Sequence, residues 1–229
     1  MPRLSLVIGM AALAGVLCAE AAQAQPSRII ISRHGEKKDS SKLCKVGKLR
    51  AQALAAQYLG KNAPGNDTIF GKGGKPDAFF AVTEHTQETA KPQAESWGKE
   101  LTVFSKGGLD TETKDAAAAL ESAAYNGKVV VVVWEHKHIA EEDSSGKEDP
   151  DTLRALLKLD QIPGANVPVK WEGDNYDYFW IVDYTGSQPT FTVVQQDYAA
   201  ATYAQVPNNG WGAKVDKSQF PEFYKDCEH

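Results

Sequence analysis

One short segment of the chain combines three side chains that suit a phosphate or carboxylate ligand, Arg33, His34 and Lys37. They follow residues 29–31, a β-branched run typical of a strand that is buried on both faces. Arginine offers a planar fork of N–H donors, and histidine titrates near neutrality and can act as a nucleophile. Gly35 lets the backbone turn sharply beside a ligand. The segment therefore predicts an anion-binding turn at the end of a strand.

Two further histidines follow apolar segments in the same way. Residues 78–82 indicate a second buried strand, which leads to His85, and the valine-rich residues 128–134 give the strongest strand signal, which leads to His136. The carboxyl ends of parallel strands lie along one edge of a sheet. We therefore expect these two histidines and His34 to converge at that edge.

The Arg-His-Gly tripeptide at residues 33–35 resembles the signature of the histidine phosphatase superfamily, which has the phosphoglycerate mutase-like fold. Residues 88–90 (Glu-Thr-Ala) with Pro92 resemble its second motif, and the valine-rich strand before His136 resembles its third. The resemblance implies an α/β fold of three layers, α/β/α, around a mostly parallel central sheet. It also implies phosphomonoester hydrolysis, in which His34 takes the phosphoryl group as a phosphohistidine and water releases it.

The resemblance assigns roles to the other site residues. Arg33 and His136 would bind phosphate oxygens and Lys37 would assist, so that no metal and no cofactor is needed. The family has an arginine three residues before Glu88, where this chain has His85. Loss of that guanidinium would cost a factor on the order of 10²–10³ in rate. A protonated histidine would replace it in part, more effectively at acid pH.

The leaving alcohol needs a general acid, and the sequence leaves its identity open. Glu135 is one candidate; Glu84, Glu141 and Glu142 are others. Alternation along a strand would point the side chains of Glu135 and His136 to opposite faces, which weakens the first candidate.

Two other functions remain open on the sequence. The histidine at position 85 also fits a phospholigand-binding protein of the same fold that has lost efficient catalysis. A zinc or copper site built from His34, His85, His136 and His138 is a third hypothesis, because imidazole clusters bind such metals. The positive charge of Arg33 would repel a metal ion, so we predict no metal.

Residues 1–24 predict a secretory signal peptide, with Arg3 before an apolar run and a small-x-small cleavage site at residues 22–24. We expect residues 25–229 to form one histidine phosphatase-like domain, in the periplasm or secreted, without membrane association once the signal is removed. The chain has a formal net charge of −5 and no basic run, which argues against nucleic-acid binding. The expected partner is a small phosphorylated substrate or phosphate.

Cys44 and Cys227 are the cysteines that remain after signal removal. In an oxidising compartment they could form a disulfide, worth ~4–5 kcal/mol in the chain-entropy model. Two separate thiols are the alternative.

The pattern also predicts elements that carry no chemistry. A helix is expected over residues 42–59, with an N-cap at residues 39–41, and its Arg50 is interpreted as a surface or packing residue. The Gly- and Lys-rich residues 62–76 predict a surface loop. Further predictions are helices at 110–125 and 151–159, a short strand at 167–171, and a hairpin of 176–184 with 189–195. Residues 200–229 show no periodicity and receive no prediction.

Overall fold

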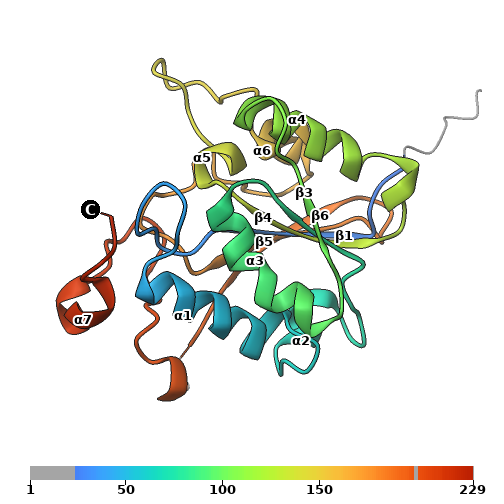
Figure 1. Cartoon of the computed structure of the whole chain (residues 1–229). Helices are drawn as coiled ribbons and strands as arrows, with labels where there is room; N and C mark the ends of the chain where they lie inside the picture. Colours follow the sequence, from blue (N-terminus) through green and yellow to red (C-terminus); the bar gives the residue numbers. More distant parts are fainter. Residues whose placement is uncertain (1–23, 199–200, 229) are drawn as a thin grey trace, which may run out of the picture.

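The computed structural model describes residues 24–198 and 201–228, so the predicted signal peptide lies almost wholly outside the described residues. Six strands form one sheet in the order β3-β2-β4-β1-β5-β6 (Figure 1). The strands are β1 (Arg28–Arg33), β2 (Ala78–Ala81), β3 (Leu101–Val103), β4 (Val129–Trp134), β5 (Tyr178–Asp183) and β6 (Thr190–Gln195).

The sheet is mostly parallel, as the sequence predicted. Strand β4 pairs in parallel with β1 and β2, and β2 pairs in parallel with β3. Strands β5 and β6 form the predicted antiparallel hairpin, and β5 also pairs antiparallel with β1.

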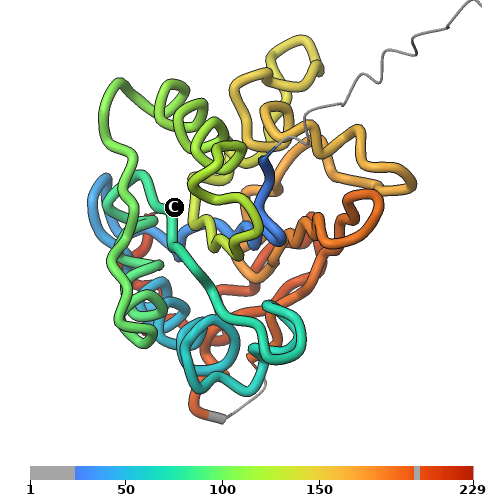
Figure 2. Tube along the Cα trace, turned by 90° about the vertical axis from the view of Figure 1, so that its right-hand side faces the viewer, coloured from blue at the N-terminus to red at the C-terminus, as the bar shows by residue number. Residues whose placement is uncertain are grey.

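Helices cover both faces of the sheet, which confirms the predicted three-layer α/β/α architecture. One face carries α1 (Lys45–Leu54), α2 (Asn66–Phe70) and α3 (Glu84–Ser96), and the other carries α4 (Leu109–Leu120), α5 (His136–Ile139) and α6 (Leu153–Leu156). In Figure 2, which is turned by 90°, α4 lies in the upper part of the molecule and α1 in the lower part. Because both faces are covered, the central strands are apolar throughout rather than alternating.

Successive side chains of each strand feed two separate cores. Ile29 and Ile31 belong to the cluster beneath α4 and α6, whereas Ile30 belongs to the cluster beneath α1 and α3. The first cluster also contains the fully buried Trp171 and Trp180, whose ring centroids are 4.9 Å apart. The β-branched run of β1 thus holds the two helix layers together.

The first helix is shorter than predicted. It begins at Lys45, with Cys44 as N-cap. Asp39 does not cap the helix; its Oδ1 instead accepts from the backbone N–H groups of Ser41 and Lys42 and closes a turn before it. Its last turn, Ala55–Leu59, is a π-helix. Helix α2 lies inside the segment predicted as a loop.

Residues 167–171 form no strand, which corrects another prediction. Their backbone makes single contacts instead: the carbonyl of Val167 accepts from Arg154, and the N–H of Trp171 donates to the carbonyl of Ala140. The predicted helices at 110–125 and 151–159 correspond to α4 and α6, and both are shorter than predicted. A 3₁₀ turn follows each of them, Ala123–Tyr125 after α4 and Leu159–Gln161 after α6.

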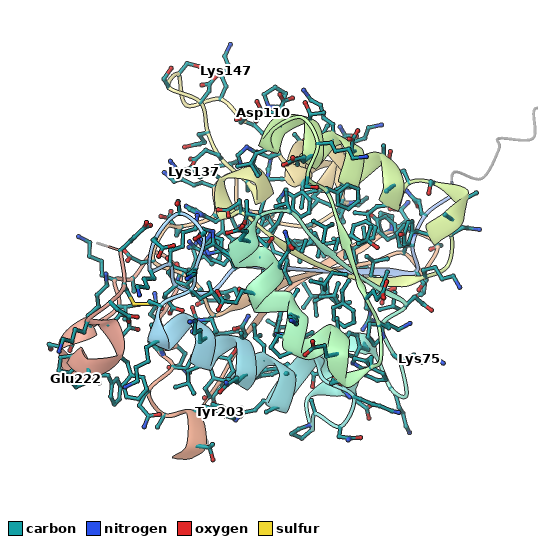
Figure 3. The ribbon with its side chains drawn as sticks, in the orientation of Figure 1. Lys75, Asp110, Lys137, Lys147, Tyr203 and Glu222 are labelled. Carbon is teal, nitrogen blue, oxygen red and sulfur yellow. A yellow bond between two sulfur atoms is a disulfide. The ribbon has the colours of Figure 1, made fainter. Side chains whose placement is uncertain are left out.

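A disulfide joins Cys44 to Cys227 across a sequence separation of 183 residues. The yellow bond in Figure 3 lies between the start of α1 and the C-terminal tail, whose short helix α7 spans Pro221–Tyr224. Within residues 24–198 and 201–228, the structure has no helix that is both long and apolar enough to cross a membrane.

Candidate active site

The register between two parallel strands brings the first and third histidine segments together. Arg33, the last residue of β1, is aligned with Trp134, the last residue of β4. The ladder continues one step further, because the N–H of His34 donates to the carbonyl of Trp134 at 3.1 Å. His136 therefore begins α5 beside the turn that carries His34.

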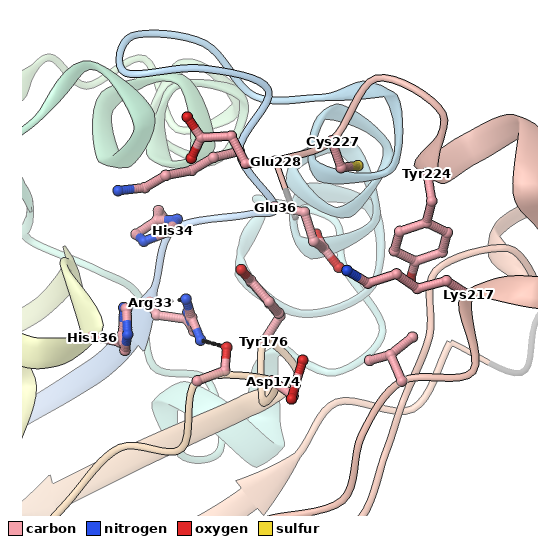
Figure 4. A pocket seen from close by; sticks show the side chains of 13 residues that line it. Arg33, His34, Glu36, His136, Asp174, Tyr176, Lys217, Tyr224, Cys227 and Glu228 are labelled. Atoms are coloured by element: carbon pink, nitrogen blue, oxygen red, sulfur yellow. Dashed lines mark hydrogen bonds between the residues drawn. The ribbon is translucent and has the colours of Figure 1, made fainter.

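A cavity of about 340 Å³ opens at this edge of the sheet (Figure 4). Three groups of residues line it: the turn after β1 with His136, the loop before β5, and the C-terminal tail. They include Arg33, His34, Glu36, Lys37, His136, Asp174, Tyr176, Lys217, Tyr224, Cys227 and Glu228.

The imidazole of His34 is oriented by its neighbour. Its Nδ1 lies 2.6 Å from the carbonyl oxygen of Gly35 and must donate there, because a carbonyl only accepts. The lone pair is then on Nε2, which is buried and makes no hydrogen bond to the described residues. Burial lowers the pKa of His34, the charge of Arg33 lowers it further, and Glu135 opposes both effects. The lowered pKa favours the neutral ring, whose nucleophilic nitrogen is Nε2, 3.2 Å from Oε2 of Glu135.

Arg33 is held rigidly beside this nitrogen. Its Nη1 donates to the carbonyl of Gly173 at 2.7 Å, and its Nη2 donates to Nδ1 of His136 at 3.2 Å. The guanidinium also lies over the ring of Tyr176, 3.7 Å from the centroid. Its Nε is buried and makes no hydrogen bond among the described residues.

His136 is a neutral donor. Arginine cannot accept a hydrogen bond, so Nδ1 of His136 accepts from Arg33 and the ring proton is on Nε2. Burial lowers the pKa of His136 to about 2, with the nearby charge of Arg33 as the next cause. His136 therefore offers an N–H to an anion without carrying a charge itself.

The expectation that Glu135 and His136 point to opposite faces is wrong, since a carboxylate oxygen of Glu135 lies within 4.8 Å of a ring nitrogen of His136. Strand alternation ends at Trp134, and Glu135 is the N-cap of α5. Its carboxylate accepts from Lys37 at 2.9 Å and from Thr83 at 2.7 Å, and Oε2 lies 3.2 Å from Nε2 of His34. Burial alone would raise the pKa of Glu135, but the neighbouring histidines and the hydrogen bond from Thr83 lower it overall.

His85 is buried behind the cavity rather than on its wall. Its Nε2 donates to the carbonyl of Asp39 at 2.7 Å, and its Nδ1 lies 3.7 Å from Oε1 of Glu135. Burial would lower the pKa of His85, but Glu135 and the Asp39 carbonyl raise it overall. His85 therefore acts on the site through Glu135, and any direct contact of His85 with a ligand stays a prediction.

The three histidines expected to converge do lie together. The ring centroid of His34 is 5.8 Å from that of His85 and 6.1 Å from that of His136. His138 is separate, and its Nε2 lies 3.1 Å from Asp110.

The same cluster contains residue types that bind metals. His34, Glu135 and His136 each bring one ligand atom within 4.8 Å of the others. A cationic group already contacts two of these side chains, Lys37 at Glu135 and Arg33 at His136, which disfavours a metal ion there.

Several residues that line the cavity were not predicted from the sequence as site residues. Tyr176 was interpreted as packing, and the tail residues Lys217, Tyr224 and Glu228 received no prediction because their segment lacks periodicity. One signal was available: a bond from Cys227 to Cys44 would place the following residue near the turn after β1.

Arg50 is a packing residue. Its Nη2 donates to Oε1 of Glu36 at 2.7 Å and to the carbonyl of Pro207 at 3.1 Å, and both side chains of the ion pair are buried. Burial would raise the pKa of Glu36, but Arg50 lowers it overall. This pair links the turn after β1 to α1 and to the tail.

Neither a protein-family model nor a curated protein sequence matches this chain. Among solved structures, it is similar to a protein assigned as phosphohistidine phosphatase SixA from Agrobacterium tumefaciens, at 14% identity and a TM-score of 0.43, over 75% of this chain and 99% of that one. It is also similar to a protein assigned as SixA from Nakamurella multipartitia, at 17% identity and a TM-score of 0.40, over 75% of this chain and 96% of that one. Similarity at this level does not establish a shared function.

Proposed function

We propose that this chain is a phosphomonoesterase of the histidine phosphatase superfamily, with the phosphoglycerate mutase-like fold, and that His34 is its nucleophile. One observation carries the proposal. Nδ1 of His34 is fixed by the Gly35 carbonyl, so that in the neutral ring the lone pair is on Nε2, next to the Glu135 carboxylate, and His34 lines a cavity together with Arg33, Lys37 and His136. A neutral nucleophile among cationic and N–H donors suits attack on a phosphate ester.

The proposed reaction has two steps. Nε2 of His34 forms a bond to phosphorus as the ester oxygen leaves, and water then attacks the phosphohistidine and releases phosphate. Arg33, Lys37 and the N–H of His136 stabilise the charge on the phosphate oxygens. Because Arg33 is already held by the Gly173 carbonyl and by His136, little reorganisation is needed on binding.

The substrate we propose is a small phosphorylated molecule. The cavity of about 340 Å³ is walled by the C-terminal tail, which limits the space beside the nucleophile. The signal-like residues 1–24 and the Cys44–Cys227 disulfide both support a periplasmic or secreted protein, since disulfides persist in oxidising compartments.

Trapping of the covalent intermediate tests the proposal. Protein mixed with 4-nitrophenyl phosphate and quenched in alkali is expected to carry a phosphoryl group on the His34 peptide by mass spectrometry, and to lose it in acid. A protein that turns over aryl phosphates without this adduct would use another nucleophile. A protein with neither turnover nor adduct between acid and neutral pH is not a phosphatase of this type.

A catalytically weakened phospholigand-binding protein is the second candidate, and the histidine at position 85 is the observation that favours it. If the site is an enzyme that relies on this cation, His85→Arg should raise turnover about tenfold or more at pH 8, and less at pH 5–6, where His85 is itself protonated. The sign follows from the raised pKa of His85, because its charge is present below that pKa and lost above it.

His85→Gln is the matched control, since the amide can still donate to the Asp39 carbonyl but carries no charge. It should lose turnover, chiefly at acid pH. If neither variant changes a measurable turnover, catalysis does not use a cation at this position; if His85→Arg leaves turnover undetectable, the binding protein becomes the better proposal.

A further inference from the structure

We propose that Glu228, on the disulfide-anchored C-terminal tail, is the general acid–base residue of this site; this assignment rests on the proposed function. The proton donor for the leaving alcohol has to be a carboxyl group at the cavity that is not held as an anion by an ion pair. Among the described residues, three carboxylates line the cavity, Glu36, Asp174 and Glu228, and a fourth, Glu135, lies beside His34.

Glu36 and Glu135 each form an ion pair with a basic residue. Glu36 is paired with Arg50 in the buried ion pair, and Glu135 accepts from Lys37 and Thr83. Both side chains are held as anions by these partners, so neither is a ready proton donor.

The position of the Glu135 carboxylate is a second reason why it cannot protonate the leaving group. Reacting atoms approach to about 3–3.5 Å, and a general acid lies about 2.6–3.2 Å from the oxygen that it protonates. An in-line donor is then roughly 6–8 Å from the nucleophilic nitrogen, on the far side of phosphorus. Oε2 of Glu135 lies only 3.2 Å from Nε2 of His34, beside the nucleophile and not behind the leaving group.

Glu228 is fixed at the cavity by the backbone. Its N–H donates to the carbonyl of Lys37 at 2.8 Å, and the preceding residue, Cys227, is bonded to Cys44. The N–H of Cys44 in turn donates to the carbonyl of Glu36 at 2.9 Å. The tail end is thus attached twice to the turn that carries His34, while the carboxyl group of Glu228 remains exposed to solvent for proton exchange.

Asp174 is the remaining rival. It follows Gly173, whose carbonyl anchors Arg33, and therefore belongs to the side of the cavity where phosphate oxygens would bind. Figure 4 shows the carboxyl groups of Asp174 and Glu228 on different sides of the cavity, with Arg33 and His136 on the Asp174 side in this view. Glu228 is therefore the carboxyl group on the side of the cavity away from Arg33 and His136, next to the turn that carries Lys37.

The proposed proton transfers balance over the cycle. As the N–P bond to His34 forms and the P–O bond to the alcohol breaks, protonated Glu228 gives its proton to the leaving oxygen. The resulting carboxylate then takes a proton from the attacking water as the O–P bond forms and the N–P bond breaks. One ester and one water become one alcohol and one phosphate, and Glu228 is protonated again.

The test compares two leaving groups, because only a basic leaving oxygen needs a proton. Glu228→Gln is expected to lower kcat about 10²–10⁴-fold for an alkyl phosphate, but less than about threefold for 2,4-dinitrophenyl phosphate. Glu222→Gln, an exposed glutamate on α7 of the same tail, is the matched control and should change neither rate. The Cys44→Ser/Cys227→Ser double variant should show the same leaving-group dependence as Glu228→Gln.

Each other outcome overturns the assignment. Equal losses for both esters in Glu228→Gln would indicate a binding role, and unchanged rates would exclude Glu228. A leaving-group-dependent loss in Asp174→Asn alone would transfer the role to Asp174. Absence of turnover of either ester by the unsubstituted protein would overturn the proposed function itself, and this assignment with it.

Discussion

Replacement of His34 by alanine is expected to lower kcat/KM for aryl phosphates by a factor on the order of 10⁴–10⁶, the scale at which a nucleophile is lost. The physical reason is that His34 lines the cavity and, with its Nδ1 fixed by the Gly35 carbonyl, has its lone pair on Nε2, the proposed nucleophilic nitrogen. Arg33 and His136 would still bind phosphate, so the affinity for inorganic phosphate should change little. Steady-state kinetics with phosphate inhibition measures both quantities.

His138→Ala is the matched control for this prediction. His138 follows β4, two residues after His136, but its ring contacts Asp110 at 3.1 Å and does not line the cavity. Its removal should leave kcat/KM within about twofold of the unsubstituted protein. Comparable activity in the His34 and His138 variants would contradict the proposed role of His34.

Loss of the Cys44–Cys227 disulfide is expected to reduce the free energy of unfolding by about 5 kcal/mol in the chain-entropy model, because the bond closes a loop with a sequence separation of 183. For a domain of this size, this corresponds to a fall in Tm of about 10–20 °C. Thermal unfolding of the Cys44→Ser/Cys227→Ser variant against the oxidised protein measures the difference.

Reduction of the unsubstituted protein is the control that keeps the side chains in place. Both cysteines pack with Val46 and Tyr224 in a small apolar cluster, and substitution by serine would disturb that cluster as well. Agreement between the reduced protein and the double variant assigns the effect to the bond. A shift below about 2 °C on reduction would show that the two thiols are not bonded in the protein.

The buried central strands and the hairpin could be predicted because their signal is local, whereas the strand expected at 167–171 is absent. The valine-rich residues 128–134 correspond to β4 (Val129–Trp134), and the hairpin of β5 and β6 was expected within two residues of its observed bounds. Continuous apolar runs at these positions are compatible with few arrangements other than strands covered on both faces. The convergence of His34 and His136 then follows from parallel pairing.

Helix ends and the last part of the chain depended on contacts that a local pattern does not contain. Asp39 was expected as a helix cap, but its carboxylate closes the preceding turn, so α1 begins at Lys45. The orientation of Glu135 was mispredicted because alternation applies only within a strand, and β4 ends one residue earlier. The tail from residue 201 has no repeating apolar pattern, and a covalent bond and single hydrogen bonds position it instead.

The tail is attached to the rest of the molecule near both of its ends. The carbonyl of Pro207 accepts from Arg50, and at the other end the bonded Cys227 precedes Glu228, which is held by the Lys37 carbonyl. A molecule that approaches the nucleophile cannot swing either end aside without breaking a buried contact or a covalent bond. The tail therefore limits access from this side, and we expect bulky esters to be hydrolysed more slowly than small ones because of their size.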